Sequence, residues 1–257
     1  MREDPLRDRL PAATPLWLEG FALAEWTALR FTPVYFGVGV PRGDGAAVIA
    51  VPGFMGSDGY LLELRHWLRR IGYSAYSSEV GQNADCLDLL SRRLLATIDL
   101  AADQTGRKVH LVGHSLGGVL ARGVCGLRPE AVATVTTMGS PIRGVRSHPL
   151  VMRMSEAVRQ RVLDRYADQD IDADCFSGDC SCDFVQSTRR RFPEQIPQMA
   201  IYTKTDGVVA WRYSRHSDPG KDVEVHGTHS GLAFNALAYT AIARFLGRHS
   251  ELKWEAS

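Results

Sequence analysis

Residues 109–118 read VHLVGHSLGG, and this stretch decides the fold. A short apolar run is followed by a tight turn and then by a pattern typical of a helix over residues 116–126. The order is strand, turn and helix, with Ser115 at the apex. Gly113 and Gly117 remove side chains that would collide with the neighbouring strand and helix. We therefore expect a strained backbone that holds the Ser115 hydroxyl out where a histidine can reach it.

The composition is that of a globular protein. The chain has 257 residues, enough for one large α/β domain or two small ones, with 45% hydrophobic and 23% charged residues. A formal net charge of +1 does not favour nucleic acid or an acidic partner. No apolar run approaches the roughly 18 residues that a membrane span needs. The charged N-terminus does not look like a secretory signal, and the odd number of cysteines weakly favours a reducing compartment, so we expect a cytoplasmic location.

Strands and helices alternate along most of the chain. This alternation implies right-handed crossovers and predicts an α/β fold, a mostly parallel sheet with helices on both faces. Active sites in such sheets lie at the carboxyl ends of the strands. The predicted strands cover residues 46–51, 73–76, 109–112, 133–138, 198–203 and 222–225, and the predicted helices cover about residues 14–31, 61–71, 85–104, 116–126 and 232–248.

Two of these helices have an apolar side that should pack on the domain. In the last helix we expect a core stripe of Leu237, Ala241 and Phe245. The N-terminal helix could instead be a membrane-surface or lid-like segment, but it lacks the lysine-rich polar face of such helices. Its predicted apolar side consists of Leu16, Trp17, Phe21, Leu23, Ala24, Trp26 and Leu29.

Residues 142–196 break the alternation. They show no strand pattern and combine a helical stretch rich in arginine, an acidic run and three clustered cysteines. We interpret this segment as a cap or lid inserted into a single domain that spans residues 1–257, although a solvated face is the usual meaning of such charge. Cys175, Cys180 and Cys182 could be reduced structural thiols, one disulfide with a spare thiol, or a metal site short of its fourth ligand.

A serine hydroxyl needs a base before it becomes a good nucleophile, and that base should be a histidine oriented by a carboxylate. Asp206 follows the strand at 198–203, and His229 follows the last strand. Both positions suit residues that must reach Ser115 from neighbouring loops. The alternatives are His226 as the base, Asp218 or Asp222 as the acid, and a purely turn-forming role for Asp206.

The reaction would also need donors for an oxyanion. One is the amide of Leu116, directly after the serine, and the second is the amide of Phe54, with that of Met55 next. We also assign Met55 and His114 to substrate binding, although His114 lies inside the turn, points away from the hydroxyl and should support the turn.

Taken together, these motifs resemble those of the α/β-hydrolase superfamily, and more narrowly of its bacterial esterase/lipase-like members. The resemblance implies a catalytic triad of Ser115, Asp206 and His229 that hydrolyses an ester and needs no cofactor and no metal. Pro52 departs from the His-Gly of many lipase-like relatives. The resemblance covers about residues 44–248 and rests on PGFMGSD at 52–58, GQN at 81–83, GHSLGG at 113–118, TDGVV at 205–209 and GTH at 227–229.

Three functional hypotheses follow. The first is a serine esterase or lipase that acts through an acyl-enzyme on a small-molecule ester or lipid. The second is a thioesterase or acyltransferase with the same triad, and the third is a binding protein with a silent site. Epoxide hydrolases and haloalkane dehalogenases share the fold but usually carry aspartate at the apex, so Ser115 argues against them. The sequence makes no prediction of oligomeric state.

Overall fold

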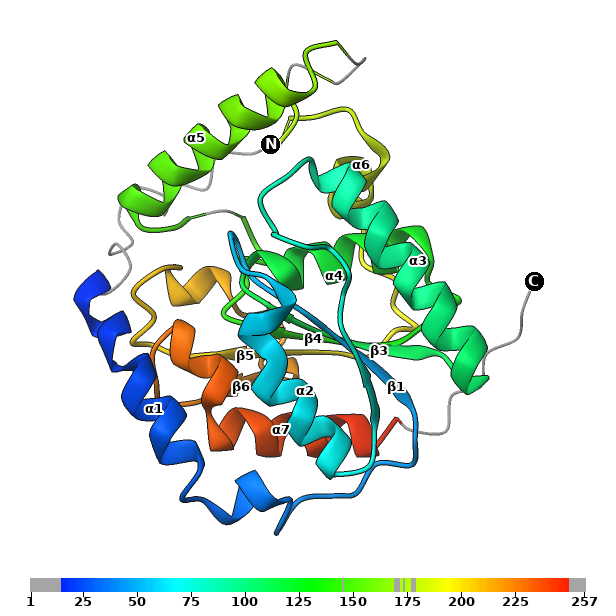
Figure 1. Ribbon diagram of the computed structural model, residues 1–257, viewed down its shortest axis with the longest axis vertical. Helices are drawn as coiled ribbons and strands as arrows, with labels where there is room; N and C mark the ends of the chain where they lie inside the picture. Colours follow the sequence, from blue (N-terminus) through cyan, green and yellow to red (C-terminus); the bar gives the residue numbers. More distant parts are fainter. Residues whose placement is uncertain (1–14, 145, 169–171, 173, 177–178, 250–257) are drawn as a thin grey trace.

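The computed structural model describes residues 15–144, 146–168, 172, 174–176 and 179–249 (Figure 1). Its strands form one six-stranded sheet in the order β2-β1-β3-β4-β5-β6, and every neighbouring pair is parallel. This architecture confirms the predicted α/β fold class. The strands are β1 (Ala47–Val51), β2 (Ser74–Tyr76), β3 (Val109–His114), β4 (Val132–Met138), β5 (Gln198–Tyr202) and β6 (Asp222–Glu224).

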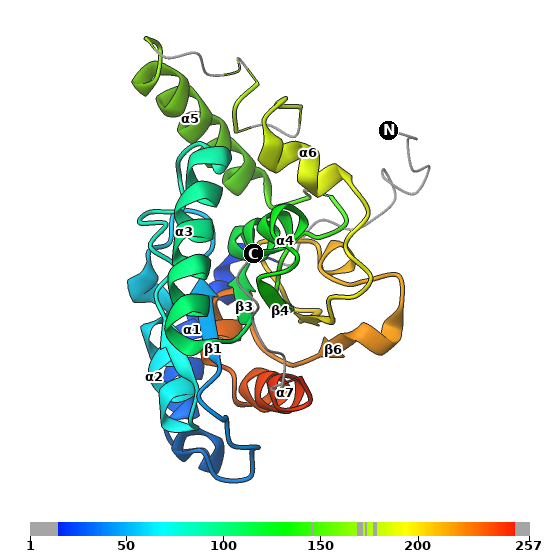
Figure 2. The same ribbon diagram turned by 90° about the vertical axis from the view of Figure 1, so that its right-hand side faces the viewer.

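Helices cover both faces of the sheet, as Figures 1 and 2 show. Alternate residues of β1 belong to different buried clusters, Val48 and Ala50 to one and Ala47 and Ile49 to the other. Because both faces are buried, the strands are continuous apolar runs. The α-helices are α1 (Ala22–Leu29), α2 (Leu62–Arg70), α3 (Leu87–Thr105), α4 (Leu116–Leu127), α5 (Pro149–Arg165), α6 (Asp183–Arg189) and α7 (Ala236–Gly247), and the 3-10 helices are η1 (Leu16–Phe21), η2 (Pro33–Phe36), η3 (Asp58–Leu61), η4 (Trp211–Tyr213), η5 (Pro219–Lys221) and η6 (Ser230–Phe234).

The strand order reverses direction between β1 and β3. At such a switch point the loops that follow the two strands diverge and leave a crevice at the carboxyl edge of the sheet. The loop after β1 carries Phe54, and the loop after β3 carries Ser115. The topology therefore brings the two sequence motifs together.

Of the core stripe predicted for the last helix, Ala241 and Phe245 pack partly buried against the core, whereas Leu237 is wrongly predicted. Leu237 is 56% exposed, whereas Ala238, Ile242 and Leu246 are buried. The helix begins at Ala236 rather than near residue 232, because the side chain of Asn235 accepts hydrogen bonds from the amides of Leu237 and Ala238 and starts a new helix there.

The apolar side predicted for the N-terminal helix is also wrong. The segment is the 3-10 helix η1 followed by α1, and of the seven predicted residues only Leu29 is fully buried. Trp17 and Leu23 are 69% and 70% exposed. The side that faces the protein is polar, because Glu19 and Glu25 accept hydrogen bonds from distant loops. Thr14, the predicted start, lies outside the described residues.

The segment between β4 and β5 contains two helices with different positions. Helix α6 packs on α4, and its Phe184 belongs to the same buried cluster as Leu120 of α4. Helix α5 lies away from the sheet, at the top of Figure 1. Its last turn is held by Asp85, which accepts hydrogen bonds from Arg165 at 3.0 Å and Tyr166 at 3.1 Å. We therefore propose that α5, rather than all of residues 142–196, forms the cap of the single domain.

No helix in the described part of the chain has both the length and the hydropathy required to cross a membrane.

Candidate active site

Ser115 lies at the junction of β3 and α4 in the strained geometry that the sequence predicts. Its backbone has φ 53° and ψ −125°, a conformation that residues other than glycine rarely adopt. The Ser115 amide donates a hydrogen bond of 2.8 Å to the carbonyl of Met138, at the end of β4. This bond fixes the turn to the neighbouring strand β4.

The glycines around Ser115 allow the backbone to approach itself closely. A Cβ on Gly113 would lie 2.4 Å from Gly118 Cα, and a Cβ on Gly117 would lie 2.2 Å from the carbonyl oxygen of Val51. Both clashes are with backbone atoms, which cannot rotate away. Glycine therefore lets the first turn of α4 pack directly against the end of β1.

The substitution Gly117→Ala is expected to destabilise the protein by about 3 kcal/mol, since β1 and α4 would have to separate. Gly126→Ala, on the same helix, is the matched control. There the added Cβ would meet Ser187 at an ordinary 3.4 Å, and helix propensity should make the change neutral or stabilising by up to about 1 kcal/mol. Urea unfolding of both variants measures the difference. Equal unfolding free energies would contradict the packing argument.

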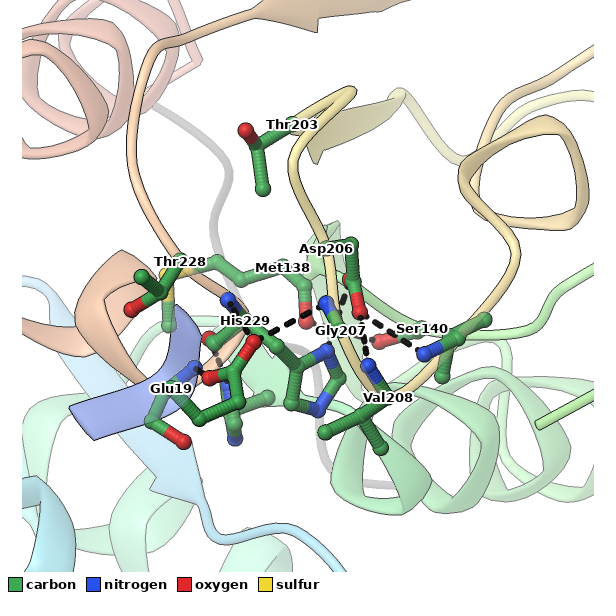
Figure 3. Close-up of polar contacts among 12 residues, drawn as sticks. Glu19, Met138, Ser140, Thr203, Asp206, Gly207, Val208, Thr228 and His229 are labelled. Atoms are coloured by element: carbon green, nitrogen blue, oxygen red, sulfur yellow. Dashed lines mark hydrogen bonds and ion pairs between the residues drawn. The ribbon is translucent and has the colours of Figure 1, made fainter. Parts of the chain in front are cut away.

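Asp206 and His229 form a buried pair (Figure 3). The Nδ1–H of His229 donates a hydrogen bond of 2.7 Å to Asp206 Oδ2. The other carboxylate oxygen, Oδ1, accepts from the amides of Val208 at 2.9 Å and Val209 at 2.7 Å. Asp206 thus stabilises its own turn and orients the imidazole as well. With Nδ1 protonated, the neutral ring has its acceptor at Nε2.

The surroundings give the two neighbouring histidines different proton affinities. Burial tends to lower the pKa of His229, but the charge of Asp206, its hydrogen bond and the charge of Glu19 raise it above the usual value. Burial lowers the pKa of His114 to about 3, with a further contribution from His229. Of these two rings, whose centroids are 4.8 Å apart, only that of His229 is suited to accept a proton near neutral pH.

The alternative acid and base residues lie elsewhere. Asp222 accepts a hydrogen bond of 2.9 Å from His216 and pairs with Arg215 at 3.4 Å. Asp218 accepts from the amide of Gly220 at the start of η5. His226 is exposed.

One cavity of about 900 Å³ collects the predicted site residues. Helix α5 contributes Val151, Met152 and Met154 to its lining, and the Phe54 ring lies 6.1 Å from that of Phe176. The exception is Asp206, which lies behind His229 and does not line the cavity. The predicted residues that do line it are Phe54, Met55, His114, Ser115, Leu116 and His229.

The amides of Phe54 and Leu116, the predicted oxyanion donors, differ in their hydrogen bonds from the amide of Met55, the alternative donor. The amide of Met55 donates to the carbonyl of Asn83 at 2.9 Å and is therefore occupied. Within the described residues, the amide of Phe54 has no backbone or side-chain acceptor. Leu116 is the first residue of α4, where amides have no partner within the helix. Phe54 and Leu116 thus present free donors beside Ser115.

Sequence reasoning did not assign a role to Asn83, which braces the loop after β1. Its side-chain amide donates to the carbonyl of Pro52 at 2.8 Å, and its backbone amide donates to that of Gly56 at 2.9 Å. The only sequence feature that pointed to Asn83 was the predicted turn at residues 81–83.

His114 supports the loop of His229. Its Nε2–H donates a hydrogen bond of 2.9 Å to the His229 carbonyl, and its ring lies 5.3 Å from that of Tyr60. The Tyr60 hydroxyl in turn donates to the Ser230 carbonyl at 2.6 Å. This arrangement agrees with the expected supporting role, and the assignment of His114 to substrate binding remains a prediction.

Two carboxylates of the N-terminal segment also reach the site. Glu19 accepts hydrogen bonds from the amides of Gly207, His229 and Ser230, and Figure 3 shows its side chain beside this part of the site. Glu25 accepts from the amide and the hydroxyl of Thr228. The only available signal was the presence of two acidic residues in a segment that is otherwise mostly apolar.

The five cysteines are free thiols. Cys86 at the start of α3 and Cys175 are buried in the same small cluster, whereas Cys180 belongs to the larger core beside α3 and α4. Free thiols at Cys175, Cys180 and Cys182 correspond to the first of the three alternatives, reduced structural thiols. Within the described ranges, no group of three histidine, cysteine or acidic side chains is arranged to hold a metal ion.

Comparisons with known proteins agree with the predicted resemblance to α/β-hydrolases of the esterase/lipase type. The family model "Palmitoyl protein thioesterase" matches residues 48–188, more than half of the chain. Triacylglycerol lipases of Pseudarthrobacter phenanthrenivorans and Burkholderia plantarii are each 35% identical over 106 residues, or 38% of this chain. These alignments cover 33% and 30% of the two lipases, so this chain matches about a third of the length of those relatives.

Solved structures share the fold at low sequence identity. Naproxen esterase from Bacillus subtilis has a TM-score of 0.51 at 13% identity, with 90% of this chain and 97% of the esterase covered. The lipase BlEst2 from Bacillus licheniformis has a TM-score of 0.55 at 17% identity, with 81% and 95% covered. These likenesses concern the fold alone.

Proposed function

The chain belongs to the palmitoyl protein thioesterase family, and from this premise we propose that it hydrolyses carboxylic esters of apolar acyl groups through an acyl-enzyme on Ser115. One observation carries the proposal. A buried histidine that is hydrogen-bonded to a buried carboxylate lines the same cavity as a strained serine. A structural role alone would not require all three features at one place.

In the proposed mechanism, the Ser115 hydroxyl attacks the ester carbonyl while His229 Nε2 takes its proton. Asp206 holds the ring in the tautomer that leaves Nε2 free, and it stabilises the imidazolium that forms. The amides of Phe54 and Leu116 stabilise the oxyanion. His229 then returns the proton to the leaving alcohol. Water, activated by the same histidine, releases the acid from Ser115.

The acyl group occupies the cavity between the loop after β1 and helix α5. Phe54, Met55 and the methionines of α5 line the cavity, whose volume of about 900 Å³ is large for a short acid alone. We therefore propose that medium or long acyl chains of small-molecule esters or lipids are preferred over acetate. The chemistry requires no cofactor.

A series of p-nitrophenyl esters from acetate to palmitate, measured at one pH, tests this proposal. We expect kcat/KM to rise from acetate to a medium or long chain, because each added methylene buries more apolar surface. Parallel assays with thioesters of the same acids, followed by loss of the thioester absorbance, compare the two leaving groups. A preference for acetate would contradict the proposed acyl site.

The family match also supports a second candidate, a thioesterase with the same catalytic residues. It would be favoured by turnover of the thioester series with little turnover of the esters. Acyl transfer to an added alcohol, in preference to water, would indicate an acyltransferase. An absence of turnover in both series would instead favour a binding protein with a silent site.

A further inference from the structure

Glu19 joins the two loops that carry the proposed acid and base. Its Oε1 accepts hydrogen bonds from the amides of Gly207 at 2.9 Å and His229 at 3.0 Å, and its Oε2 accepts from the amide of Ser230 at 2.7 Å. These donors lie 188, 210 and 211 residues further along the chain. Gly207 directly follows Asp206, so one carboxylate contacts the backbone of both loops (Figure 3).

Glycines in the two loops leave room for the carboxylates of Glu19 and Glu25. A Cβ on Gly207 would lie 2.9 Å from Glu19 Oε1, and a Cβ on Gly231 would lie 1.6 Å from Glu25 Oε2. Glu25 accepts from the Thr228 amide at 2.9 Å and from its hydroxyl at 2.6 Å, immediately before His229. The glycines therefore complement the carboxylates of η1 and α1.

These contacts stabilise a particular arrangement of the site. Hydrogen bonds to an ionised carboxylate are about twice as strong as neutral ones, and Glu19 accepts three of them. Misplacement of a catalytic group by about 1 Å can cost about 100-fold in rate. The match to the family model spans residues 48–188 and includes neither Glu19 nor the three amides that donate to it.

We propose that Glu19 is a positioning residue for the proposed hydrolysis, in which its carboxylate clamps the loop of Asp206 to the loop of His229. The inference rests on the proposed function. Glu19 touches the backbone of His229 but not the reacting atoms, and it acts through the orientation of the imidazole.

The negative charge of Glu19 also affects the pKa of His229. Burial lowers the pKa of His229, whereas Asp206 and, to a lesser extent, Glu19 raise it. The other titratable groups around the His229 loop are His114, which donates to its carbonyl, Tyr60 on the Ser230 carbonyl and Glu25 on Thr228. The charges that favour the imidazolium of His229 are those of Asp206 and Glu19. Loss of the Glu19 charge should therefore lower the pKa of His229.

The test compares Glu19→Gln with wild type on the best ester of the series. Glutamine keeps the shape but turns an NH₂ group toward backbone N–H donors, so part of the clamp is lost. We expect kcat per active site to fall about 10- to 100-fold with KM within about twofold. The acidic limb of the kcat/KM profile should move to lower pH. Glu19→Asp, which keeps the charge but is shorter, should restore the position of that limb and part of kcat.

Two controls separate the clamp from general effects. Leu23→Ala changes a side chain of the same segment that is 70% exposed, and Asp103→Asn removes an exposed negative charge on α3. Both should retain the kcat and pH profile of wild type. Titration with a fluorophosphonate counts active sites, so that a variant with less folded protein is not mistaken for one with slower turnover.

A spectroscopic signature provides a measurement without turnover. The Nδ1–H of His229, donated to Asp206, should give a low-field proton resonance that His229→Ala removes. We expect Glu19→Gln to shift or broaden it and Leu23→Ala to leave it unchanged. If Glu19→Gln does not fold, the resonance and the kcat of Glu19→Asp decide, and values equal to those of wild type refute the clamp.

The outcomes distinguish this inference from the function on which it rests. If Ser115→Ala keeps the activity of wild type, the proposed function fails. If Ser115→Ala is inactive but Glu19→Gln shows the kcat, pH profile and resonance of wild type, the clamp is wrong and the proposed function stands.

Discussion

The variant Ser115→Ala is expected to lose about a million-fold in kcat for ester hydrolysis. The substitution removes the atom that would attack the carbonyl, and neither water nor a neighbouring group can take its place in the acyl-enzyme. The amides of Phe54 and Leu116 and the acyl cavity remain, so some acceleration over the uncatalysed reaction should persist. Stability should change little, because alanine keeps the Cβ and the strained backbone does not depend on the hydroxyl.

Two measurements check this expectation. The first is the rate on the best p-nitrophenyl ester, and the second is covalent labelling by a fluorophosphonate, which reports the activated serine directly. Ser217→Ala, which removes an exposed hydroxyl from the loop before Asp218, is the control and should be labelled like wild type. Labelling of Ser115→Ala at the rate of wild type would contradict the assignment of the nucleophile.

The variant Asp206→Asn is expected to lower kcat about 10,000-fold at neutral pH. The asparagine can turn its NH₂ group toward His229 Nδ1, which would then be the acceptor, with the proton on Nε2. In that tautomer the ring cannot take the proton of Ser115. The effect on kcat should thus exceed that of any change at Glu19, which leaves the Asp206–His229 hydrogen bond in place.

The pH profile provides a second test of Asp206. The base must be neutral, so the acidic limb of kcat/KM follows the pKa of His229 in the free enzyme. Burial lowers this pKa, and the charge and hydrogen bond of Asp206, together with the charge of Glu19, raise it above the usual value. In Asp206→Asn burial remains while the charge is gone, so the limb should move to lower pH. Asp218→Asn, at the exposed alternative acid, is the control, and a larger loss there would contradict the assignment of Asp206.

The strand, turn and helix around Ser115 and the sheet that holds them were predictable from local sequence. Close backbone contacts at Gly113 and Gly117 require glycine wherever the turn occurs, and buried parallel strands require continuous apolar runs, so both leave a local pattern. The positions of Asp206 and His229 after successive strands followed from topology. Their pairing was implied by the resemblance, while the residues alone also allowed a purely turn-forming role for Asp206 before a glycine.

Two helices show how far a local pattern predicts a buried face, because the pattern fails at Leu237 of the last helix and along most of the N-terminal segment. In α7 the fully buried residues are Ala238, Ile242 and Leu246, while Ala241 and Phe245 pack partly buried beside them and Leu237 is exposed. In the N-terminal segment, hydrophobicity favours burial of Trp17 and Leu23. The structure instead exposes them and turns Glu19 toward the site.

The sequence by itself thus determined the fold class, the apex position of Ser115 and the loops from which an acid and a base could come, since each depends on neighbours within a few residues. The resemblance implied that Asp206 pairs with His229, whereas only the tertiary structure decided that Met55 is not a free donor and that Glu19 spans the two loops. These are hydrogen-bond choices made by amides and carboxylates far apart in the chain. A buried polar group is stable only when it has a hydrogen-bond partner, and a local sequence pattern does not identify a partner that is far away in the chain.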